Sequence, residues 1–343
     1  MPTIPPSQPG LFDYQDRLDY LRTRPKGLDH LNEVVNWEVF RSELEQAVVP
    51  EPQGPGGRPR FDVVLMFKIV VLQRTYNLSD AESEFQILDR FSFQRFLGLT
   101  VADSVPDEKT LWAFKERLRK HGGLERCFAE FGRQLASRGI RSSPGKIVDA
   151  TFVDVPRQQN SQDEYRDIKA GRTPDEWKKD PPARSRQKDV DARWSYKGTE
   201  RHFGYKLHIK IDRQQKIIET LAVAPANVSE SLVAQTLLRN GDQSLYGDSA
   251  YSRASMHQAL SERGIADRTL TQARRNTPLT LQQQAWNRAR RRIRVRVEHV
   301  FGFLHNSMKG LYIRTIGLER ATATMTMASL VYNMHRMAQL RRA

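Results

Sequence analysis

The run that decides the fold is Phe203-Gly204-Tyr205-Lys206-Leu207-His208-Ile209-Lys210-Ile211, in which large apolar side chains alternate with polar or small ones. A period of two is typical of a β-strand that buries one face. Residues 146–155, which precede this run, are also β-like, and residues 217–223 follow it across a polar turn. The sequence therefore predicts a meander of three strands.

The chain after this meander alternates between helical and strand-like patterns. We expect, in order, a helix, a strand, a helix, a short strand and two long helices, at residues 229–239, 244–247, 252–263, from 265, 280–308 and 319–341. The order βββ-α-β-α-β-αα is the connectivity of an RNase H-like fold. Residues 141–343 are therefore predicted to form an α/β domain with an RNase H-like mixed sheet flanked by helices.

The residues before the sheet have helical patterns, so we expect an all-helical N-terminal domain over residues 36–140, behind a flexible leader at 1–35. Ser79 and Glu82 form a capping-box pattern at the start of one helix, and residues 107–120 fit another. Short helices with short joints are typical of a helix-turn-helix DNA reader, and equally of a scaffold or dimerisation bundle. Both remain open, because DNA readers are usually basic and this part is nearly neutral.

Charge is distributed unevenly along the 343 residues, whose net charge is +15. Residues 1–140 hold 19 basic and 20 acidic side chains, whereas residues 141–343 hold 36 and 20. A polyanion is the natural partner of the second part, because each neutralised phosphate releases condensed counterions. A basic surface without a specific partner is the alternative.

The remaining composition limits the class of protein. The N-terminus lacks the basic start and apolar core of a signal peptide, and no apolar run approaches the roughly 18 residues of a membrane span. We therefore expect a cytoplasmic protein without a membrane partner. The single cysteine, Cys127, excludes an intramolecular disulfide and a cysteine-based zinc site, and its helical setting favours a packed thiol.

A long polar loop is expected at residues 158–202, between the first two strands of the meander. Loops of this length are often functional, and the alternative is a disordered insertion with little apolar surface to bury. Within it, residues 191–194 are best suited to become ordered on DNA, through a phosphate contact of Arg193 and stacking of Trp194.

Three carboxylates occupy distinctive places in the sequence. Asp149 closes a strand-like run, Asp248 follows another, and Glu298 lies in the arginine-rich segment 288–298. A fold that brings the strand ends together would cluster these acids, and such a cluster favours hard cations such as Mg²⁺. Two such ions about 3.5–4 Å apart can activate the nucleophile and stabilise the leaving oxygen in phosphodiester cleavage or strand transfer.

The arginine-rich segment predicts how the third acid is presented. On a helix Arg291, Arg294 and Glu298 share a face, so the acid would point at the metals while the arginines meet phosphate. A solvated Arg–Glu pair remains an alternative for this segment, as does a turn or cap role for each aspartate. Asp154 is either an accessory ligand or a loop acid.

These residues resemble the DDE transposases of bacterial insertion sequences, nearest the insertion-sequence-five type. The resemblance covers residues 36–335 and is specific in Ile147-Val148-Asp149-Ala150-Thr151, Gly247-Asp248-Ser249-Ala250-Tyr251 and Arg294 through Gly302. Residues 80–82, 106–110, 191–194 and 203–208 also look like the family. The resemblance implies that Asp149, Asp248 and Glu298 are the catalytic and metal-binding triad, and that the cofactor is Mg²⁺, for which Mn²⁺ can substitute.

The resemblance also implies a DNA-contacting set, although the chain departs from the family motif. The usual tyrosine before the motif arginine is Arg291 here, and the usual lysine after the glutamate is His305, with Lys309 one turn further on. Arg291 and Lys309 are expected to replace these phosphate contacts. The expected DNA-binding side chains are Arg193, Trp194, Lys206, Arg291, Arg294, His299, His305 and Lys309, and His208 is a further candidate.

The function implied is that of a transposase that binds the terminal inverted repeats of an insertion sequence, cleaves at the ends and joins them to target DNA. Its expected partner is double-stranded DNA, on which a homodimer holds two ends together, in the bacterial cytoplasm at the nucleoid. Two alternatives remain: a domesticated or inactive DNA-binding protein of the same fold, and a metal-dependent nuclease without strand transfer.

Overall fold

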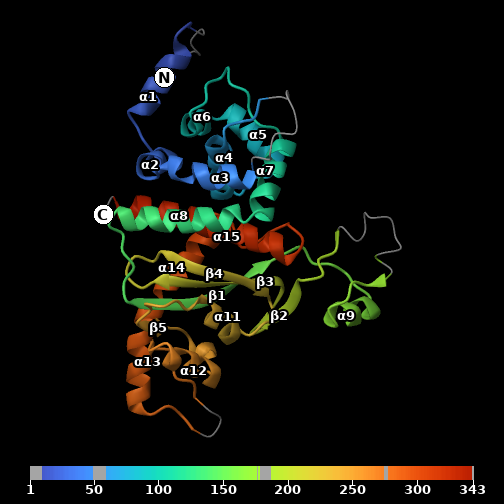
Figure 1. Cartoon of the computed structure of the whole chain (residues 1–343), viewed down its shortest axis with the longest axis vertical. Coiled ribbons are helices and arrows are strands. Elements are labelled where there is room, and N and C mark those ends of the chain that lie inside the picture. Colours follow the sequence, from blue (N-terminus) through green and yellow to red (C-terminus); the bar gives the residue numbers. More distant parts are fainter. Residues whose placement is uncertain (1–9, 49–58, 176, 178–186, 274–276, 342–343) are drawn as a thin grey trace, which may run out of the picture.

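The computed structural model describes residues 10–48, 59–175, 177, 187–273 and 277–341, and Figure 1 shows their arrangement. The first part is helical, as expected. Its elements are α1 Asp13–Arg22, α2 Gly27–Val34, the 3₁₀ turn η1 Trp37–Phe40, α3 Arg41–Val48, α4 Val63–Tyr76, α5 Asp80–Asp89, α6 Phe91–Leu97, α7 Glu108–Lys120 and α8 Gly123–Ser137. The side chains of Ser79 and Asp107 accept backbone N–H groups at the starts of α5 and α7, so both helices begin where the sequence predicted.

The flexible leader expected over residues 1–35 requires correction, because its described part is helical over α1 and α2. Helix α1 has no buried residue, but α2 buries Leu28, Leu31 and Val34 in the apolar core. Asp29 also accepts from Arg95 of α6 at 2.7 Å. Apolar side chains spaced three residues apart thus fix α2 to the helical part. Residues 1–9 lie outside the described residues.

The sheet has the strand order and directions of an RNase H-like fold. Its strands are β1 Gly145–Asp154, β2 Arg193–Lys197, β3 Glu200–Asp212, β4 Ile218–Pro225, β5 Ser244–Tyr246 and β6 Ala266–Asp267. The strand order is β2-β3-β1-β5-β6, with β4 also paired to β3. Strands β1, β3 and β4 form the expected antiparallel meander, whereas β5 lies parallel to β1 and β6 parallel to β5.

Helices cover both faces of the sheet. On one face α11 Glu230–Leu237 and α12 Ala254–Glu262 enclose a small apolar cluster that includes Val148 and Leu245. On the other face α15 Leu318–Leu340 lies between the sheet and the N-terminal helices (Figure 1). One apolar cluster runs from those helices through α15 to β1, β3 and β4. Within the described residues, no helix is both long and apolar enough to cross a membrane.

The single helix expected over residues 280–308 is interrupted. It consists of α13 Leu281–Arg294, α14 Arg296–Gly302 and the π-helical turn η4 Phe303–Ser307. At the junction the N–H of Glu298 bonds the carbonyl of Val295, three residues earlier, instead of a carbonyl four residues earlier. The helical hydrogen-bond ladder therefore shifts just before Glu298.

The long polar loop expected at 158–202 contains regular structure in its described part. Helix α9 Gln162–Lys169 begins with a full capping box between Ser161 and Glu164, and β2 pairs with β3. Trp177 is buried and donates its indole N–H to Glu164. This part is therefore no disordered insertion, because local caps and strand pairing satisfy its backbone. Residues 176 and 178–186 lie outside the described part.

Cys127 is fully buried on α8, as expected for a packed thiol. Burial raises the pKa of this thiol to about 12, and the nearby carboxylate of Glu43 adds to the shift. A thiol with such a pKa carries almost no thiolate at neutral pH, so Cys127 is unsuited to nucleophilic chemistry.

Candidate active site

Asp149 sits in the middle of β1, where strand geometry fixes the direction of its side chain. Its neighbour Val148 packs into the cluster beneath α11 and α12, so Asp149 faces the opposite side of the sheet. Asp149 pairs in register with Ile209 of β3 and is only 8% exposed. The N–H of Ala150 donates to one carboxylate oxygen at 2.9 Å, leaving the other to face α13 and α14.

Asp248 reaches the same region from β5. That strand lies parallel to β1 with Tyr246 opposite Ile147, and Asp248 follows two residues after Tyr246. Its carboxylate accepts the N–H of Ala250 at 2.8 Å and so caps the 3₁₀ turn η3 Ser249–Tyr251. A β-carbon at Gly247 would lie 3.0 Å from the Tyr251 ring, so the small residue before Asp248 lets this turn close.

Glu298 approaches from α14, and Arg294 at the end of α13 connects it to β1. Arg294 donates to Asp149 at 2.6 Å and to Glu298 at 3.0 Å. The side chain of Glu298 is 53% exposed, whereas that of Asp149 is 11% exposed. The predicted shared face of Arg294 and Glu298 therefore survives the break at Val295, and the arginine bridges two acids far apart in sequence.

The three carboxylates share one electrostatic environment. Burial is the main cause that raises the pKa of Asp149 to about 7; Arg294 opposes the rise, and the charges of Asp248 and Glu298 add to it. Burial likewise raises the pKa of Asp248. The pKa of the buried Tyr251 phenol is also raised, chiefly by burial and further by Asp149 and Asp248. Crowded negative charge at the edge of the core favours a bound cation.

The donor set suits a hard divalent cation, because carboxylate oxygens are the ligands that Mg²⁺ and Mn²⁺ prefer. Among the described residues, however, no three acidic, histidine or cysteine side chains are already arranged as a metal site. The guanidinium of Arg294 instead satisfies Asp149 and Glu298. The three carboxylates are therefore chemically suitable metal ligands, but Arg294 must first release its ion pairs with Asp149 and Glu298.

The other predicted DNA-binding residues fall into two groups. Arg291, His299, His305 and Lys309 are exposed on α13, α14, η4 and the residues just after them. Arg193 instead donates to three backbone carbonyls, and Lys206 pairs with Glu230 at 2.9 Å. Trp194 is half-buried against Phe203 and donates to Tyr165. The second group therefore already has intramolecular partners.

The side chains of Asp154 and His208 lie on the opposite face of the sheet from that of Asp149, because His208 pairs with Ala150. Asp154 is five residues beyond Asp149 on β1, so its side chain faces the other side of the sheet, about 17 Å along the strand. It bonds His202 at 3.1 Å. His208 is only 1% exposed, and neither ring nitrogen has a partner among the described residues. A phosphate contact of His208 is therefore contradicted by its burial.

Burial of His208 leads to a prediction about pH. Burial, with a smaller effect of Lys206, lowers the pKa of His208 to about 4, so the folded state binds fewer protons than the unfolded state between pH 4 and 6.5. The contribution of His208 to stability is therefore fully present above pH 6.5 and is lost as the pH falls toward 4. The free energy of unfolding of wild type should fall between pH 7 and pH 4.5. In His208→Leu this fall should be smaller by about 2.5 kcal/mol.

Urea unfolding at several pH values measures this difference. The exposed His299→Gln serves as the control and should follow the wild-type pH dependence. Parallel curves for wild type and His208→Leu would show that His208 does not titrate in this way.

Glu230, Arg290 and Tyr251 also contribute to the site region, although the sequence alone assigned none of them a role. Glu230 begins α11, pairs with Lys206, and adds to the raised pKa of both Asp248 and Tyr251. Arg290 donates to the carbonyl of Thr269 at 2.6 Å and anchors α13 beside β6. The tight Gly-Asp-Ser-Ala-Tyr turn could have pointed to Tyr251, but the roles of Glu230 and Arg290 require the tertiary structure.

The chain is similar to known proteins both in sequence and in structure. A model described as "Transposase DDE domain" matches residues 140–334, and one described as "Transposase domain (DUF772)" matches residues 16–117. The structure is similar to a piggyBac transposase synaptic complex with hairpin DNA, with a TM-score of 0.48 and 9% identity, over 91% of this chain and 72% of that one.

A second similar structure is the Mos1 mariner paired end complex with Mn, with a TM-score of 0.25 and 11% identity, over 96% of this chain and 90% of that one. Both TM-scores lie below 0.5, so the assignment rests on the sequence families. The first of these matches more than half of the chain. The chain therefore belongs to the transposase DDE domain family, and it is a transposase.

Proposed function

We propose that this transposase binds the inverted-repeat ends of an insertion sequence, cleaves DNA there and joins the 3′-hydroxyls to target DNA by Mg²⁺-dependent phosphoryl transfer. The observation that carries the proposal is that Arg294 pairs with both Asp149 of β1 and Glu298 of α14, while the charge of Asp248, just after β5, helps to raise the pKa of Asp149. Acids so far apart in sequence share one environment only because the sheet topology brings them together.

In this proposal Asp149, Asp248 and Glu298 hold the divalent ions. When bound, such ions activate the attacking oxygen and stabilise the leaving oxygen of the phosphodiester. The chain's own contribution is to orient three carboxylates at the edge of the core, where Asp149 is shielded from water. A new bond forms between the attacking oxygen and phosphorus while the bond to the leaving oxygen breaks.

Arg294 has a second role in the proposal. In the structure it pairs with the buried Asp149 and the exposed Glu298, and so offsets the repulsion between these two carboxylates. A DNA phosphate offers the guanidinium an equivalent bidentate partner. Transfer of Arg294 from the carboxylates to a phosphate would free the acids for the metals as the DNA end arrives.

The surface beside the acids supports duplex DNA as the partner. Arg291 and His299 are exposed next to Arg294 and Glu298, and His305 and Lys309 follow on η4 and the residues after it. The basic excess of residues 141–343 suits the phosphate backbone. Two transposon ends must be held together, so we propose a homodimer on DNA, acting in the cytoplasm at the nucleoid.

The test uses a labelled duplex of the DNA end that flanks the gene, together with a target plasmid. Wild type with Mg²⁺ is expected to nick at the end boundary and form a joined product, whereas EDTA or Asp149→Ala prevents both steps. Cleavage without joining would indicate a nuclease. Binding without any cleavage under optimal metal would indicate an inactive DNA-binding protein, and the proposal would then fail.

A further inference from the structure

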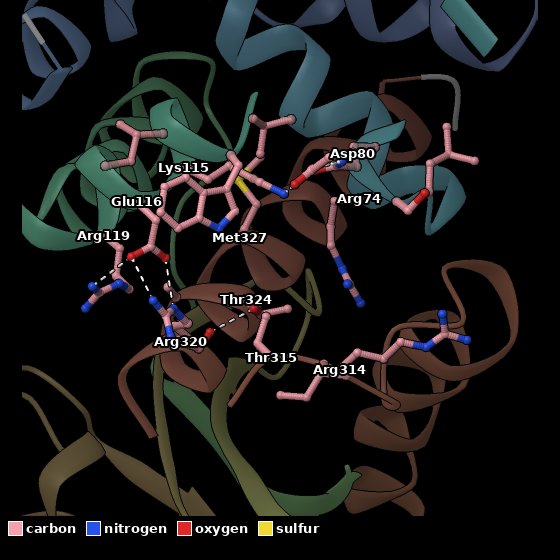
Figure 2. A pocket seen from close by; sticks show the side chains of 18 of the residues that line it. Arg74, Asp80, Lys115, Glu116, Arg119, Arg314, Thr315, Arg320, Thr324 and Met327 are labelled. Atoms are coloured by element: carbon pink, nitrogen blue, oxygen red, sulfur yellow. Dashed lines mark hydrogen bonds and ion pairs between the residues drawn. The ribbon is translucent and has the colours of Figure 1, made fainter. Parts of the chain in front are cut away.

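A cavity of about 480 Å³ lies between the N-terminal helices and the last part of the chain (Figure 2). Its walls come from α4, α5, α7, residues 312–315 and the start of α15. The backbone of Tyr312 bridges Asp154 on β1, about 17 Å along the strand from Asp149, so the cavity is separate from the three carboxylates. Its volume is within the range of pockets that hold small ligands, which often lie where domains meet.

One side of the cavity is fixed by ion pairs. Glu116 of α7 accepts from Arg119 on its own helix at 3.0 Å and from Arg320 of α15 at 3.0 Å (Figure 2). Lys115 pairs with Asp80 of α5. The Glu116–Arg320 pair joins α7 to α15, and the Lys115–Asp80 pair joins α7 to α5. Each pair neutralises the charges that it contains.

Two cations on the other side have no carboxylate partner among the described residues. Arg74 of α4 donates to the carbonyl of Gly310 at 2.9 Å, but its Nε is buried and has no hydrogen-bond partner in the part of the chain that the structure describes. Arg314 is exposed and forms no ion pair or hydrogen bond within the described part of the chain. Figure 2 shows Arg74 and Arg314 on the side of the cavity opposite Glu116. The hydroxyl oxygen of Thr315, which also lines the cavity, is buried and has no hydrogen-bond partner among the described residues.

The absence of a counter-charge is costly for Arg74. Burial lowers the pKa of its guanidinium to about 10, which means that the surroundings disfavour the charged form. An anion between Arg74 and Arg314 would remove this penalty, and phosphate oxygens match the geometry of guanidinium donors.

The rest of the lining is apolar and includes an exposed aromatic ring. Trp112 of α7 lines the cavity and is 55% exposed, whereas Ile313 and Met327 form buried parts of the wall. Trp112 lines the same cavity as the two cations, and an exposed indole is a surface on which nucleic acid bases stack. The volume suits one small ligand and excludes a duplex.

We propose that this cavity binds one unpaired nucleotide, with its phosphate on Arg74 and Arg314 and its base on Trp112. The nucleotide can come from a DNA strand or from a free mononucleotide, which offer the same phosphate and base. A DNA source rests on the proposed function, whereas a free nucleotide does not. The site is distinct from the three carboxylates and lies between the N-terminal helices and α15.

The test is calorimetric binding to the full chain carrying Asp149→Ala, so that no DNA is cleaved. The probes are deoxyadenosine 5′-monophosphate, deoxyadenosine without phosphate, a single-stranded hexanucleotide and a blunt duplex. In this background Arg314→Ala and Trp112→Ala are each expected to weaken mononucleotide binding about tenfold. Arg138→Ala removes another exposed arginine, which follows the last residue of α8 and lies outside the cavity, and should leave binding unchanged.

Arg74 needs a conservative variant, because it also holds the carbonyl of Gly310. Arg74→Lys keeps the positive charge but loses the bidentate geometry of the guanidinium. It should therefore weaken binding of the mononucleotide more than binding of deoxyadenosine, which has no phosphate. Circular dichroism melting of each variant checks the fold, and Arg314→Ala is expected to melt as the parent because Arg314 has no described partner.

The possible results test two questions separately: whether the cavity binds a nucleotide, and whether that nucleotide belongs to a DNA strand. No binding of the mononucleotide or the hexanucleotide overturns the proposal, as does equal affinity in Arg314→Ala, Trp112→Ala and Arg138→Ala. Competition between the hexanucleotide and the mononucleotide supports a DNA source, whereas binding of the mononucleotide alone supports the site and rejects that source. Binding with no end joining by the wild type would reject the proposed function and leave the cavity site standing.

Discussion

Replacement of Asp248 by alanine is expected to reduce end joining by about 10³-fold or more, because loss of a metal-holding carboxylate removes several kcal/mol of transition-state stabilisation. Affinity for the end duplex should change little, since the exposed basic residues on α13 and α14 remain. Joining of a labelled end to a plasmid measures the first effect, and a gel-shift titration of the same duplex measures the second.

The matched control is Asp154→Ala, which removes an acid from the end of β1 on the opposite face of the sheet. This variant should join ends at nearly the wild-type rate, because Asp154 pairs with His202 and lies away from Arg294. Normal joining by Asp248→Ala would remove Asp248 from the mechanism. Equal losses in both variants would instead indicate a general effect of charge or folding.

The largest stability effect outside the apolar core is expected for Asp189→Ala, at about 3–5 kcal/mol. Asp189 is 4% exposed and accepts the Tyr205 hydroxyl at 2.7 Å and the N–H of Gly317, which precedes α15, at 3.1 Å. It also accepts the N–H groups of Asp191 and Ala192. Alanine leaves these buried donors without an acceptor, and urea unfolding measures the cost.

Asp191→Ala provides the comparison two residues away. The Asp191 carboxylate accepts the N–H of Leu318 at 2.9 Å, in the manner of a helix cap, and its loss should cost about 1 kcal/mol. Similar unfolding free energies for the two variants would contradict the prediction that Asp189 stabilises the fold more than Asp191 does. Asp189→Asn, which keeps one acceptor oxygen, should fall between Asp189→Ala and wild type.

These contacts change the interpretation of residues 191–194. The sequence suggested a segment that orders on DNA, but Asp191 accepts the N–H of Leu318 at the start of α15. The Arg193 guanidinium is also engaged, because it donates to backbone carbonyls at positions 168, 190 and 192. The family-like pattern there thus has a structural explanation in this chain. A DNA contact by Trp194 remains a prediction, because its ring is only half-buried.

Apart from α9, β2 and the break in the helix at Val295, the order of strands and helices in the catalytic part followed from the sequence alone. Period-two runs such as residues 203–211 can bury apolar groups on one face only as strands, and the later helices repeat with the period of a helix. The same local patterns placed Asp149 on a strand and Asp248 just after another, and set Glu298 one turn after Arg294. Proximity along one strand or helix is fixed by local geometry, so sequence spacing predicts it.

The tertiary structure alone decided which distant groups meet. Parallel pairing of β5 with β1 brings Asp248 beside Asp149, and the turn from α13 to α14 lets Arg294 bridge Asp149 and Glu298. Packing of α15 against both the helices and the sheet also creates the cavity beside Arg74. Such contacts depend on the burial of surfaces far apart in the chain, and local periodicity carries no record of which surfaces those are.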